Sequence, residues 1–199
     1  FQGVLTGKSP KWGGSLIRPE ATGYGSVYYS QNIFAFQGET LEGKICTVSG
    51  SGNVAQYTIE KCMDLGAKCV TCSDSGGYIH EPAGFTRAQL AYIMELKNVR
   101  RGRISEYAEW SETATYHAGE RPWGVKCDIA YPSATQNEIL IDDAKKLVAN
   151  GCRCCCEGAN MPTTNEALTY MKENGVWLGV AKAANAGGVA VSGLEMAQD

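Results

Sequence analysis

Residues 44–55 read KICTVSGSGNVA, and this stretch decides the fold. Within it, residues 45–48 form a short run of apolar and β-branched side chains, which is typical of a buried strand. Gly50 and Gly52 open the pattern G-x-G-x-x-A, which ends at Ala55, and the residues that follow have the pattern of a helix. The stretch therefore predicts a strand, a tight glycine turn and a helix in direct succession.

Such a turn predicts a dinucleotide-binding site. Gly50 permits the sharp turn, Gly52 lets the backbone come close to a pyrophosphate, and Ala55 is small enough for the helix to pack against the strand. The backbone N–H groups of the turn and the N-terminus of the helix would then face the phosphates. A glycine-rich turn that binds no nucleotide has the same local pattern, so the motif alone leaves that alternative open.

The rest of the chain alternates between short apolar runs and helical patterns. We expect further strands at residues 69–73, 125–130, 152–157 and 176–180. We expect helices between Pro19 and Gly38, at 54–63, 86–100, 105–110, 142–149 and 164–173, and after residue 188, with loops at 74–82, 113–123 and 183–188. Because the strands are apolar throughout, they read as buried on both faces. This pattern predicts an α/β fold with a doubly wound, mostly parallel sheet, the Rossmann-type dinucleotide-binding domain.

Small polar residues follow several of the expected strands. They occupy positions 49–50, 73–75, 132–135 and 158–160. In an open parallel sheet, ligands bind in the crevice outside the carboxyl ends of the strands. Four such loops at one edge of the sheet favour a binding site there.

The composition argues against two classes of partner. The 199 residues carry a formal net charge of −3 and no basic cluster, so we expect no nucleic-acid partner. No apolar run approaches the length of a membrane span, and Phe1 is not followed by the pattern of a signal peptide. We therefore expect no membrane partner and a cytoplasmic location, and we expect the sequence to be part of a longer protein.

Nine cysteines, three of them consecutive, make an unpromising disulfide framework, and reduced thiols in a cytosolic protein are the simpler interpretation. Cys69 and Cys72 form a C-x-x-C pair, but they lie in an expected strand. Residues i and i+3 of a strand point to opposite faces, so these two thiols cannot easily bind one ion. We therefore expect no metal site and interpret the cysteines as small buried apolar residues.

The choice of cofactor depends on the residues after the second strand. Asp74 would favour NAD, because a carboxylate there binds the ribose 2′-hydroxyl and repels a 2′-phosphate. Ser75 can instead donate to a phosphate, and Lys97 and Arg100, spaced i,i+3, would project from one face of a helix. On composition alone, however, a solvated helix end is the simpler interpretation of Lys97 and Arg100.

Longer motifs identify a family. The chain resembles the hexameric glutamate dehydrogenases in four segments that occur in the family's order, namely residues 13–25, 132–138, 158–164 and 185–196. The resemblance covers essentially the whole chain. Leucine and phenylalanine dehydrogenases belong to the same superfamily, but the loops of this chain resemble theirs less closely than those of the glutamate dehydrogenases.

The resemblance implies an enzyme that interconverts L-glutamate with 2-oxoglutarate and ammonia by hydride transfer, and a homohexamer for the full-length protein. By position, Thr22, Asn53, Asn160 and Asn185 match cofactor contacts, and Ser192 matches the serine that binds the side-chain carboxylate of the substrate. Without the family, Ser192 would read as a residue of the first turn of a helix. Ser75, Lys97 and Arg100 match positions that hold a 2′-phosphate, so we expect NADP, with NAD as the alternative.

The resemblance also defines what to expect of the catalytic residues. The family's catalytic lysine and its aspartate match no residue of this chain, because their motifs precede the matching segments. Lys8 and Lys11 do not lie in the family's glycine-rich lysine motif. We therefore expect residues 1–18 to be the tail of a substrate domain and a hinge, 19–184 to bind the dinucleotide, and 185–199 to return to the substrate domain. We expect the 199 residues alone to be inactive.

Two other functions fit parts of the pattern. A non-catalytic dinucleotide-binding or regulatory module would need the glycine turn but no substrate residues. A methyltransferase-like doubly wound fold has a similar first glycine loop, but it does not account for the phosphate-binding residues or for the Ser192 segment.

Overall fold

The computed structural model describes residues 6–12, 14–16 and 19–196. Gly13, Ile17 and Arg18 of the first family segment therefore lie outside the described residues, as do residues 1–5 and 197–199. No helix in the described part of the chain has the length and apolar character needed to cross a membrane.

The described residues form a five-stranded parallel sheet in the order β2-β1-β6-β7-β8. The strands are β1 (Ile45–Val48), β2 (Lys68–Cys69), β6 (Ile129–Tyr131), β7 (Cys154–Cys156) and β8 (Trp177–Gly179). Because β2 lies on one side of β1 and β6 lies on the other, the winding of the chain reverses at β1. The predicted doubly wound, mostly parallel α/β fold is thus confirmed.

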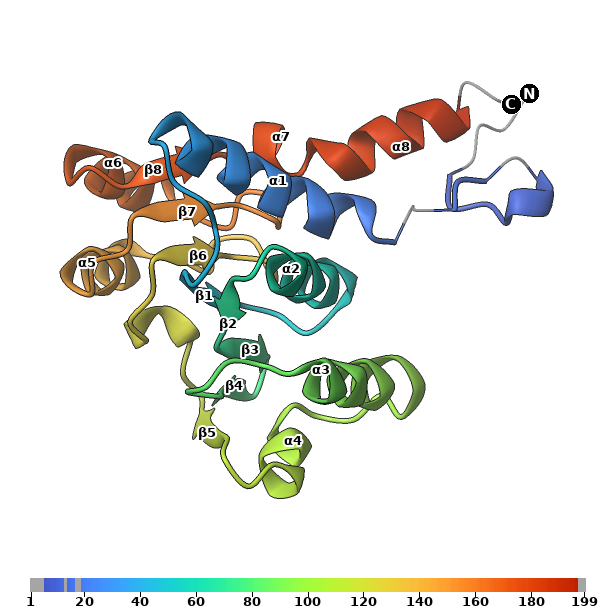
Figure 1. Cartoon of the computed structure of the whole chain (residues 1–199), viewed down its shortest axis with the longest axis horizontal. Coiled ribbons are helices and arrows are strands. Elements are labelled where there is room, and N and C mark those ends of the chain that lie inside the picture. The colour runs from blue at the N-terminus through green and yellow to red at the C-terminus, as the bar shows by residue number, and fades with distance from the viewer. Residues whose placement is uncertain (1–5, 13, 17–18, 197–199) are drawn as a thin grey trace.

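Helices cover both faces of this sheet (Figure 1). The first face carries α1 (Ala21–Phe36) and α2 (Asn53–Asp64), and the second carries α5 (Ile141–Ala149) and α6 (Asn165–Glu173). Each face of the sheet has its own apolar core, and the side chains of β7 alternate between the two. Cys154 and Cys156 belong to the first core, whereas Cys155 belongs to the second. All three are buried. Three consecutive cysteines thus serve two separate cores.

A second sheet differs from the sequence prediction. β3 (Thr71–Asp74), β4 (Gly77–His80) and β5 (Thr115–Ala118) pair antiparallel, although residues 74–82 and 113–123 read as loops. The reason is that β4 and β5 are only four residues long and mix polar with apolar side chains, so neither shows a clear strand pattern. Gly77 allows the close pairing, because a Cβ there would lie 2.2 Å from the carbonyl oxygen of His117.

The helices next to the second sheet are α3 (Arg87–Met94), a π-helical turn at Glu95–Val99 and α4 (Ser105–Trp110). The helix predicted at 86–100 is therefore interrupted near its C-terminal end. A π-helix forms i→i+5 hydrogen bonds, as in the bond from Arg100 N to Glu95 O. The wider turn rotates the side chains that follow it away from the positions of a regular helix.

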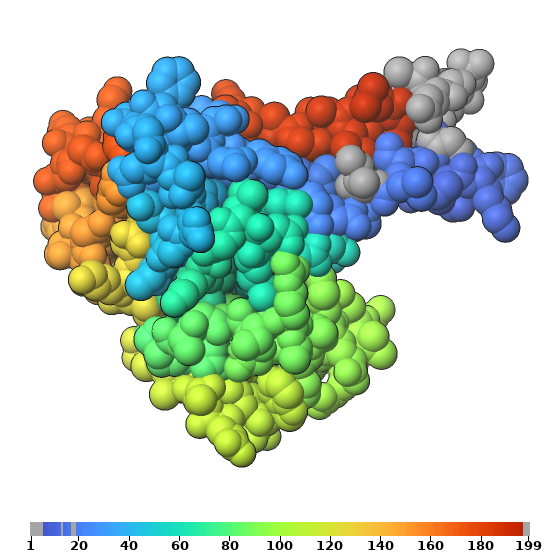
Figure 2. Space-filling model, in the orientation of Figure 1, coloured from blue at the N-terminus to red at the C-terminus, as the bar shows by residue number. Residues whose placement is uncertain are grey.

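The C-terminal part of the chain is more helical than predicted. α7 (Ala181–Ala184) and α8 (Ala186–Met196) occupy most of the predicted loop at 183–188, and the remaining short helices are 3₁₀ turns at Pro10–Trp12 and Pro122–Gly124. The buried carboxylate of Glu195 accepts hydrogen bonds from Gly7 N at 2.8 Å and Ser15 N at 2.9 Å. The described N-terminal residues and α8 thus form an arm that extends beyond the body of the domain (Figure 2).

A buried carboxylate holds the second sheet to α3 and α4. Glu81 is 1% exposed and accepts hydrogen bonds from Gln89, Tyr107, Ser111 and Thr113. Burial, together with the neighbouring carboxylate of Glu81, raises the pKa of Tyr107, so its hydroxyl stays a donor. One acidic side chain thus satisfies donors from several elements.

We expect Glu81→Ala to lower the free energy of unfolding by about 3 kcal/mol, because it leaves the buried Tyr107 hydroxyl and three less buried donors without their acceptor. Glu81→Gln keeps one acceptor oxygen and should lose less. Urea unfolding followed by tryptophan fluorescence measures both. Equal losses for the two variants would show that the hydrogen bonds are not the source of the stability.

Candidate functional site

Two adjoining clefts lie at the carboxyl ends of the parallel strands. The first, which we call the turn cleft, has a volume of about 730 Å³ and is bordered by residues 50–54 and 73–75. The second, the α8 cleft, has a volume of about 460 Å³ and is bordered by residues 158–160 and the start of α8. Val54 and residues 133–135 line both clefts. The two therefore form one groove across the sheet edge, where the sequence predicted a binding site.

The two glycines of the turn have different structural roles. Gly50 has φ +82°, and a Cβ there would lie 2.9 Å from Ser133 O, so both the backbone and the packing require glycine. Its N–H donates to Ser73 Oγ at 2.8 Å. Gly52 has an extended backbone, and a Cβ there would meet no atom within 4 Å. Gly52 thus leaves open space in the cleft, into which a ligand could approach the backbone.

The start of α2 adds donors to this open space. Gly52 is the N-cap of the helix, and no side chain caps the first turn. Asn53 is the first helical residue and lines the turn cleft with Gly50 and Gly52. Uncapped N–H groups at the positive end of a helix of 12 residues suit an anion, so these residues fit a pyrophosphate.

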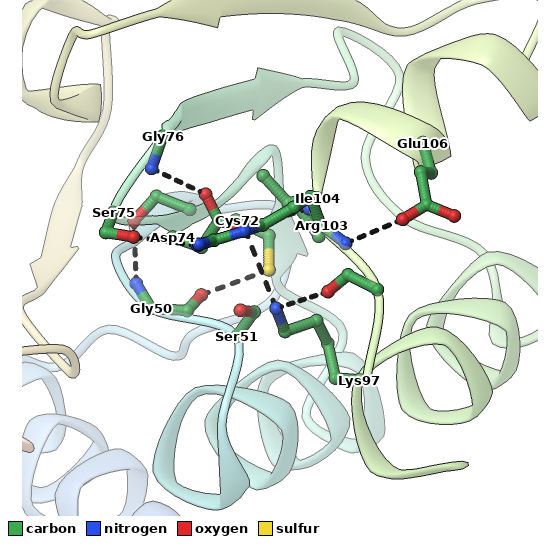
Figure 3. Close-up of polar contacts among 12 residues, drawn as sticks. Gly50, Ser51, Cys72, Asp74, Ser75, Gly76, Lys97, Arg103, Ile104 and Glu106 are labelled. Atoms are coloured by element: carbon green, nitrogen blue, oxygen red, sulfur yellow. Dashed lines mark hydrogen bonds and ion pairs between the residues drawn. The ribbon is translucent and has the colours of Figure 1, made fainter. Parts of the chain in front are cut away.

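Asp74 lies at the far end of the turn cleft, but both of its carboxylate oxygens have protein partners (Figure 3). Oδ1 accepts from Gly76 N at 2.8 Å, and Oδ2 accepts from Ile104 N at 2.9 Å. Lys97 Nζ lies 3.6 Å from Oδ2 and donates to Gly102 O at 2.8 Å. Asp74 therefore organises the loop after β3, and it has little capacity left for a ribose hydroxyl.

Lys97 and Arg100 have different partners, although the sequence spacing predicted that both would project from one helix face. Arg100 pairs with Glu106 at 2.9 Å and donates to Tyr92 at 3.3 Å, and neither Lys97 nor Arg100 lines the two clefts. The π-helical turn is the physical reason, because it breaks the i,i+3 alignment of a regular helix.

Arg103 also lines neither cleft, but it contacts Ser75, which lines the turn cleft. Arg103 Nη1 donates to Ser75 Oγ at 2.9 Å (Figure 3). Both side chains are exposed, and among the described residues no carboxylate lies within ion-pair distance of the Arg103 guanidinium. Arg103 was not among the residues predicted from the sequence. The only signal for it was the local density of arginines at positions 100–103, from which the i,i+3 spacing selected Arg100.

Four predicted residues meet in the α8 cleft. Thr22, Asn160, Asn185 and Ser192 all line it, although they lie on three separate segments of the chain. Asn185 Nδ2 donates to Asn160 Oδ1 at 3.0 Å, which ties the loop after β7 to the start of α8. Ser192 Oγ donates to Gly188 O at 3.0 Å within α8, so Ser192 lies inside the helix and not in its first turn.

Glu138 is the last residue of the family segment 132–138, and no role was predicted for it. Its Oε1 accepts from Ala134 N at 3.1 Å and Thr135 N at 3.3 Å, and it lines the turn cleft. Burial raises the pKa of Glu138. Its backbone carbonyl accepts from Arg121 and Trp123. Glu138 therefore shapes the loop that both clefts share.

The two cysteines of the C-x-x-C pair have different neighbours. Cys72 Sγ donates to Gly50 O at 3.0 Å, beneath the glycine turn. The Cys69 sulfur instead lies together with those of Cys46 and Cys62, all within 4.8 Å of one another. Cys69 and Cys72 lie on different strands, β2 and β3, and both belong to the first core, so the expectation that they point to opposite faces of one strand is wrong.

Comparisons with known proteins agree with this geometry. Residues 13–199 match the sequence profile of the glutamate/leucine/phenylalanine/valine dehydrogenases. A glutamate dehydrogenase of Bacteroides thetaiotaomicron is 59% identical over 199 residues, which are all of this chain and 45% of that protein. An NADP-specific glutamate dehydrogenase of Haemophilus influenzae is 56% identical over 195 residues, 98% of this chain and 43% of that protein.

A solved structure gives the same result for the fold. The Plasmodium falciparum glutamate dehydrogenase superposes with a TM-score of 0.94 at 50% identity, over 98% of this chain and 42% of that one. The chain thus spans less than half the length of these three relatives. The profile match over nearly all residues and the shared fold confirm the resemblance, and the chain belongs to the glutamate/leucine/phenylalanine/valine dehydrogenase family.

Proposed function

We propose that the full-length protein is an NADP-dependent glutamate dehydrogenase, which interconverts L-glutamate with 2-oxoglutarate and ammonia. The observation that carries the proposal is the continuity of the turn cleft and the α8 cleft through residues 133–135. A dinucleotide is long, and its two ends need different chemistry. One groove here joins an anion-binding turn to a cluster of amide and hydroxyl side chains.

Each part of the groove fits one part of the cofactor. The turn at Gly52 and Asn53 would hold the pyrophosphate, and Ser75 would contact the adenosine ribose or its phosphate. Thr22, Asn160 and Asn185 of the α8 cleft would position the nicotinamide end. The relatives that are named as NADP-specific support the same cofactor.

The preference for NADP rests on charge. A 2′-phosphate beside Ser75 would meet the Arg103 guanidinium, whose five N–H donors suit a phosphate. Lys97 adds positive charge, although Asp74 partly offsets it at 3.6 Å. Arg100 would have to leave Glu106 to take part. NAD remains the second cofactor to test, because an adenosine ribose without the phosphate also fits beside Ser75.

The reaction also needs residues that this chain does not supply. Bound NADPH would provide the hydride for an imine of 2-oxoglutarate and ammonia. Ser192 and the amides of the α8 cleft would orient the reacting carbon but cannot act as a general base. We assign the family's catalytic lysine to another part of the full-length protein, and we expect residues 1–199 alone to bind cofactor without turnover.

The proposed organisation follows from the arm. Residues 19–184 would bind the cofactor, and residues 1–18 and 185–199 would lead to the substrate domain. The hydrogen bonds of Glu195 to Gly7 and Ser15 support this division, because they join the two connections. The resemblance further implies a homohexamer, which sedimentation of the full-length protein tests. Nine free cysteines in the structure favour a reducing compartment such as the cytoplasm.

The test is an activity assay on the full-length protein. NADPH oxidation should require both 2-oxoglutarate and ammonium, and omission of either should stop it. Tight binding of NADPH without any turnover would instead support the non-catalytic module. Turnover with S-adenosylmethionine in place of NADPH would support the methyltransferase alternative.

Ser192→Ala tests the substrate position. We expect KM for 2-oxoglutarate to rise about tenfold or more, because the variant loses a hydrogen bond to a carboxylate, while the dissociation constant of NADPH stays unchanged. Thr169→Ala is the matched control, because its hydroxyl also donates to a carbonyl within its own helix but lies outside both clefts. Parallel changes in KM and NADPH affinity would contradict the assignment.

A further inference from the structure

Three cysteines from consecutive elements meet in the first core. Cys46 lies on β1, Cys62 lies on α2 and Cys69 lies on β2, and their sulfur atoms all lie within 4.8 Å of one another. Cys46 and Cys69 are direct neighbours in the parallel pairing of β1 and β2. These elements form the βαβ unit that contains the glycine turn (Figure 1). All three thiols are at most 1% exposed.

The spacing suits a single three-coordinate atom. Three points within 4.8 Å of one another have a common centre at most about 2.8 Å from each. Bonds between thiolates and a bound zinc ion are about 2.3 Å long, so inward shifts of about 0.5 Å would allow all three sulfurs to bond one atom. Soft, thiophilic elements prefer such sulfur donors.

The charge of the bound atom decides which of these chemical elements fits the site. The core around the three thiols is apolar and includes Leu41 and Ile59. The strongest electrostatic influences on the thiols come from one another, from Cys72 and from Tyr131, and none of these groups is a cation. Three thiolates around a divalent ion would leave one uncompensated negative charge in this core, which is costly. A trivalent atom would leave none.

We propose that Cys46, Cys62 and Cys69 form a binding site for a trivalent thiophilic metalloid, the class to which arsenite belongs. Neutral As(OH)₃ exchanges its three hydroxyl groups for the three thiols. Three As–O bonds and three S–H bonds break, three As–S bonds form, and each thiol proton leaves with one hydroxyl group as water. Arsenic stays trivalent, no electron is transferred, and the product is neutral.

The three thiols are buried, so the reagent needs a route to them. Cys62 lies two residues before the end of α2, where local opening of a helix costs least. Bound arsenic would join β1, α2 and β2 covalently. Cys46, Cys62 and Cys69 line neither cleft, so this site is separate from the proposed cofactor site.

The test uses the full-length protein in its reduced form, incubated with arsenite and freed of excess reagent. We expect one arsenic atom at this site per chain, three sulfur neighbours in X-ray absorption at the arsenic edge, and an anomalous peak between the three sulfurs in wild-type crystals. The melting temperature should rise, because the bound atom links three elements of the core.

Variants then assign the ligands. Cys62→Ala should weaken arsenite binding at this site by about tenfold or more, because it removes one of three linked contacts. Cys155→Ala is the matched control, because Cys155 is equally buried but belongs to the second core. If Cys62→Ala does not fold, the wild-type anomalous peak still decides the question.

Three results would overturn the proposal. The first is an anomalous peak at Cys127 and Cys152 with none among the three sulfurs. The second is coordination by only two sulfurs in the wild-type protein. The third is retention of cadmium ions but not of arsenite at this site, which would show that charge neutrality does not select the ligand.

Discussion

Gly52→Asp is expected to raise the dissociation constant of NADPH about a hundredfold or more while leaving the stability of the domain unchanged or higher. A Cβ at Gly52 meets no protein atom, so the protein itself accommodates the side chain. Aspartate is a favoured N-cap residue and complements the positive end of α2. The same carboxylate would occupy the space next to the turn and repel a pyrophosphate. Loss of two charge-assisted hydrogen bonds, at about 1.5–3 kcal/mol each, accounts for the expected factor.

Two further variants separate the steric effect from the effect of charge on NADPH binding and compare the two glycines of the turn. Gly52→Asn has nearly the same volume without the charge, so its weaker effect on NADPH binding would measure the steric part. Gly50→Ala should lower the free energy of unfolding by about 1–3 kcal/mol, because φ is +82° and the new Cβ approaches Ser133 O. Calorimetry and fluorescence titration measure stability and binding. Normal NADPH binding by Gly52→Asp would show that the pyrophosphate does not approach this turn.

Arg103→Ala is expected to raise KM for NADPH about tenfold to a hundredfold and to leave KM for NADH nearly unchanged. Arg103 donates to Ser75 at the rim of the turn cleft, and a hydrogen bond to a charged partner contributes about 1.5–3 kcal/mol. Only NADPH carries the 2′-phosphate that would form this bond. The ratio of kcat/KM for the two cofactors, measured on the full-length protein, is the readout.

Arg100→Ala and Arg87→Ala are the comparisons. Arg100 already pairs with Glu106, and Arg87, the first residue of α3, pairs with Asp64 at the end of α2, so both variants should change the cofactor ratio less than Arg103→Ala does. A larger effect at Arg100 would mean that its side chain leaves Glu106 when the cofactor binds. That outcome would restore the position favoured by the family resemblance and would contradict our choice of Arg103.

Patterns that depend on neighbouring residues could be predicted from the sequence. The glycine turn, α2 and the parallel strands follow from periodicity and from the need of Gly50 for a positive φ. The groove was also predictable, because polar residues at the ends of parallel strands meet at one edge. Thr22, Asn160, Asn185 and Ser192 could be assigned only through the family, since their own spacing along the chain carries no signal.

Features that depend on distant contacts could not be predicted. β4 and β5 pair with each other although few of their residues alternate clearly, and the polar Glu81 is buried because α3 and α4 supply its donors. The π-helical turn at Glu95–Val99 changed which arginine reaches Ser75, and no propensity rule marks such a turn. Local spacing therefore identified the segment, but it could not show that Arg103 is the arginine that contacts Ser75.

The alternation of Cys154, Cys155 and Cys156 along β7 has a consequence for oxidative damage. The sheet separates two groups of thiols. Cys155 lies in the same core as Cys127 and Cys152, whereas Cys154 and Cys156 lie in the core on the other face. Neighbours in sequence thus cannot reach each other to form a disulfide without breaking the strand. An oxidant that enters one layer of helices leaves the thiols behind the sheet reduced.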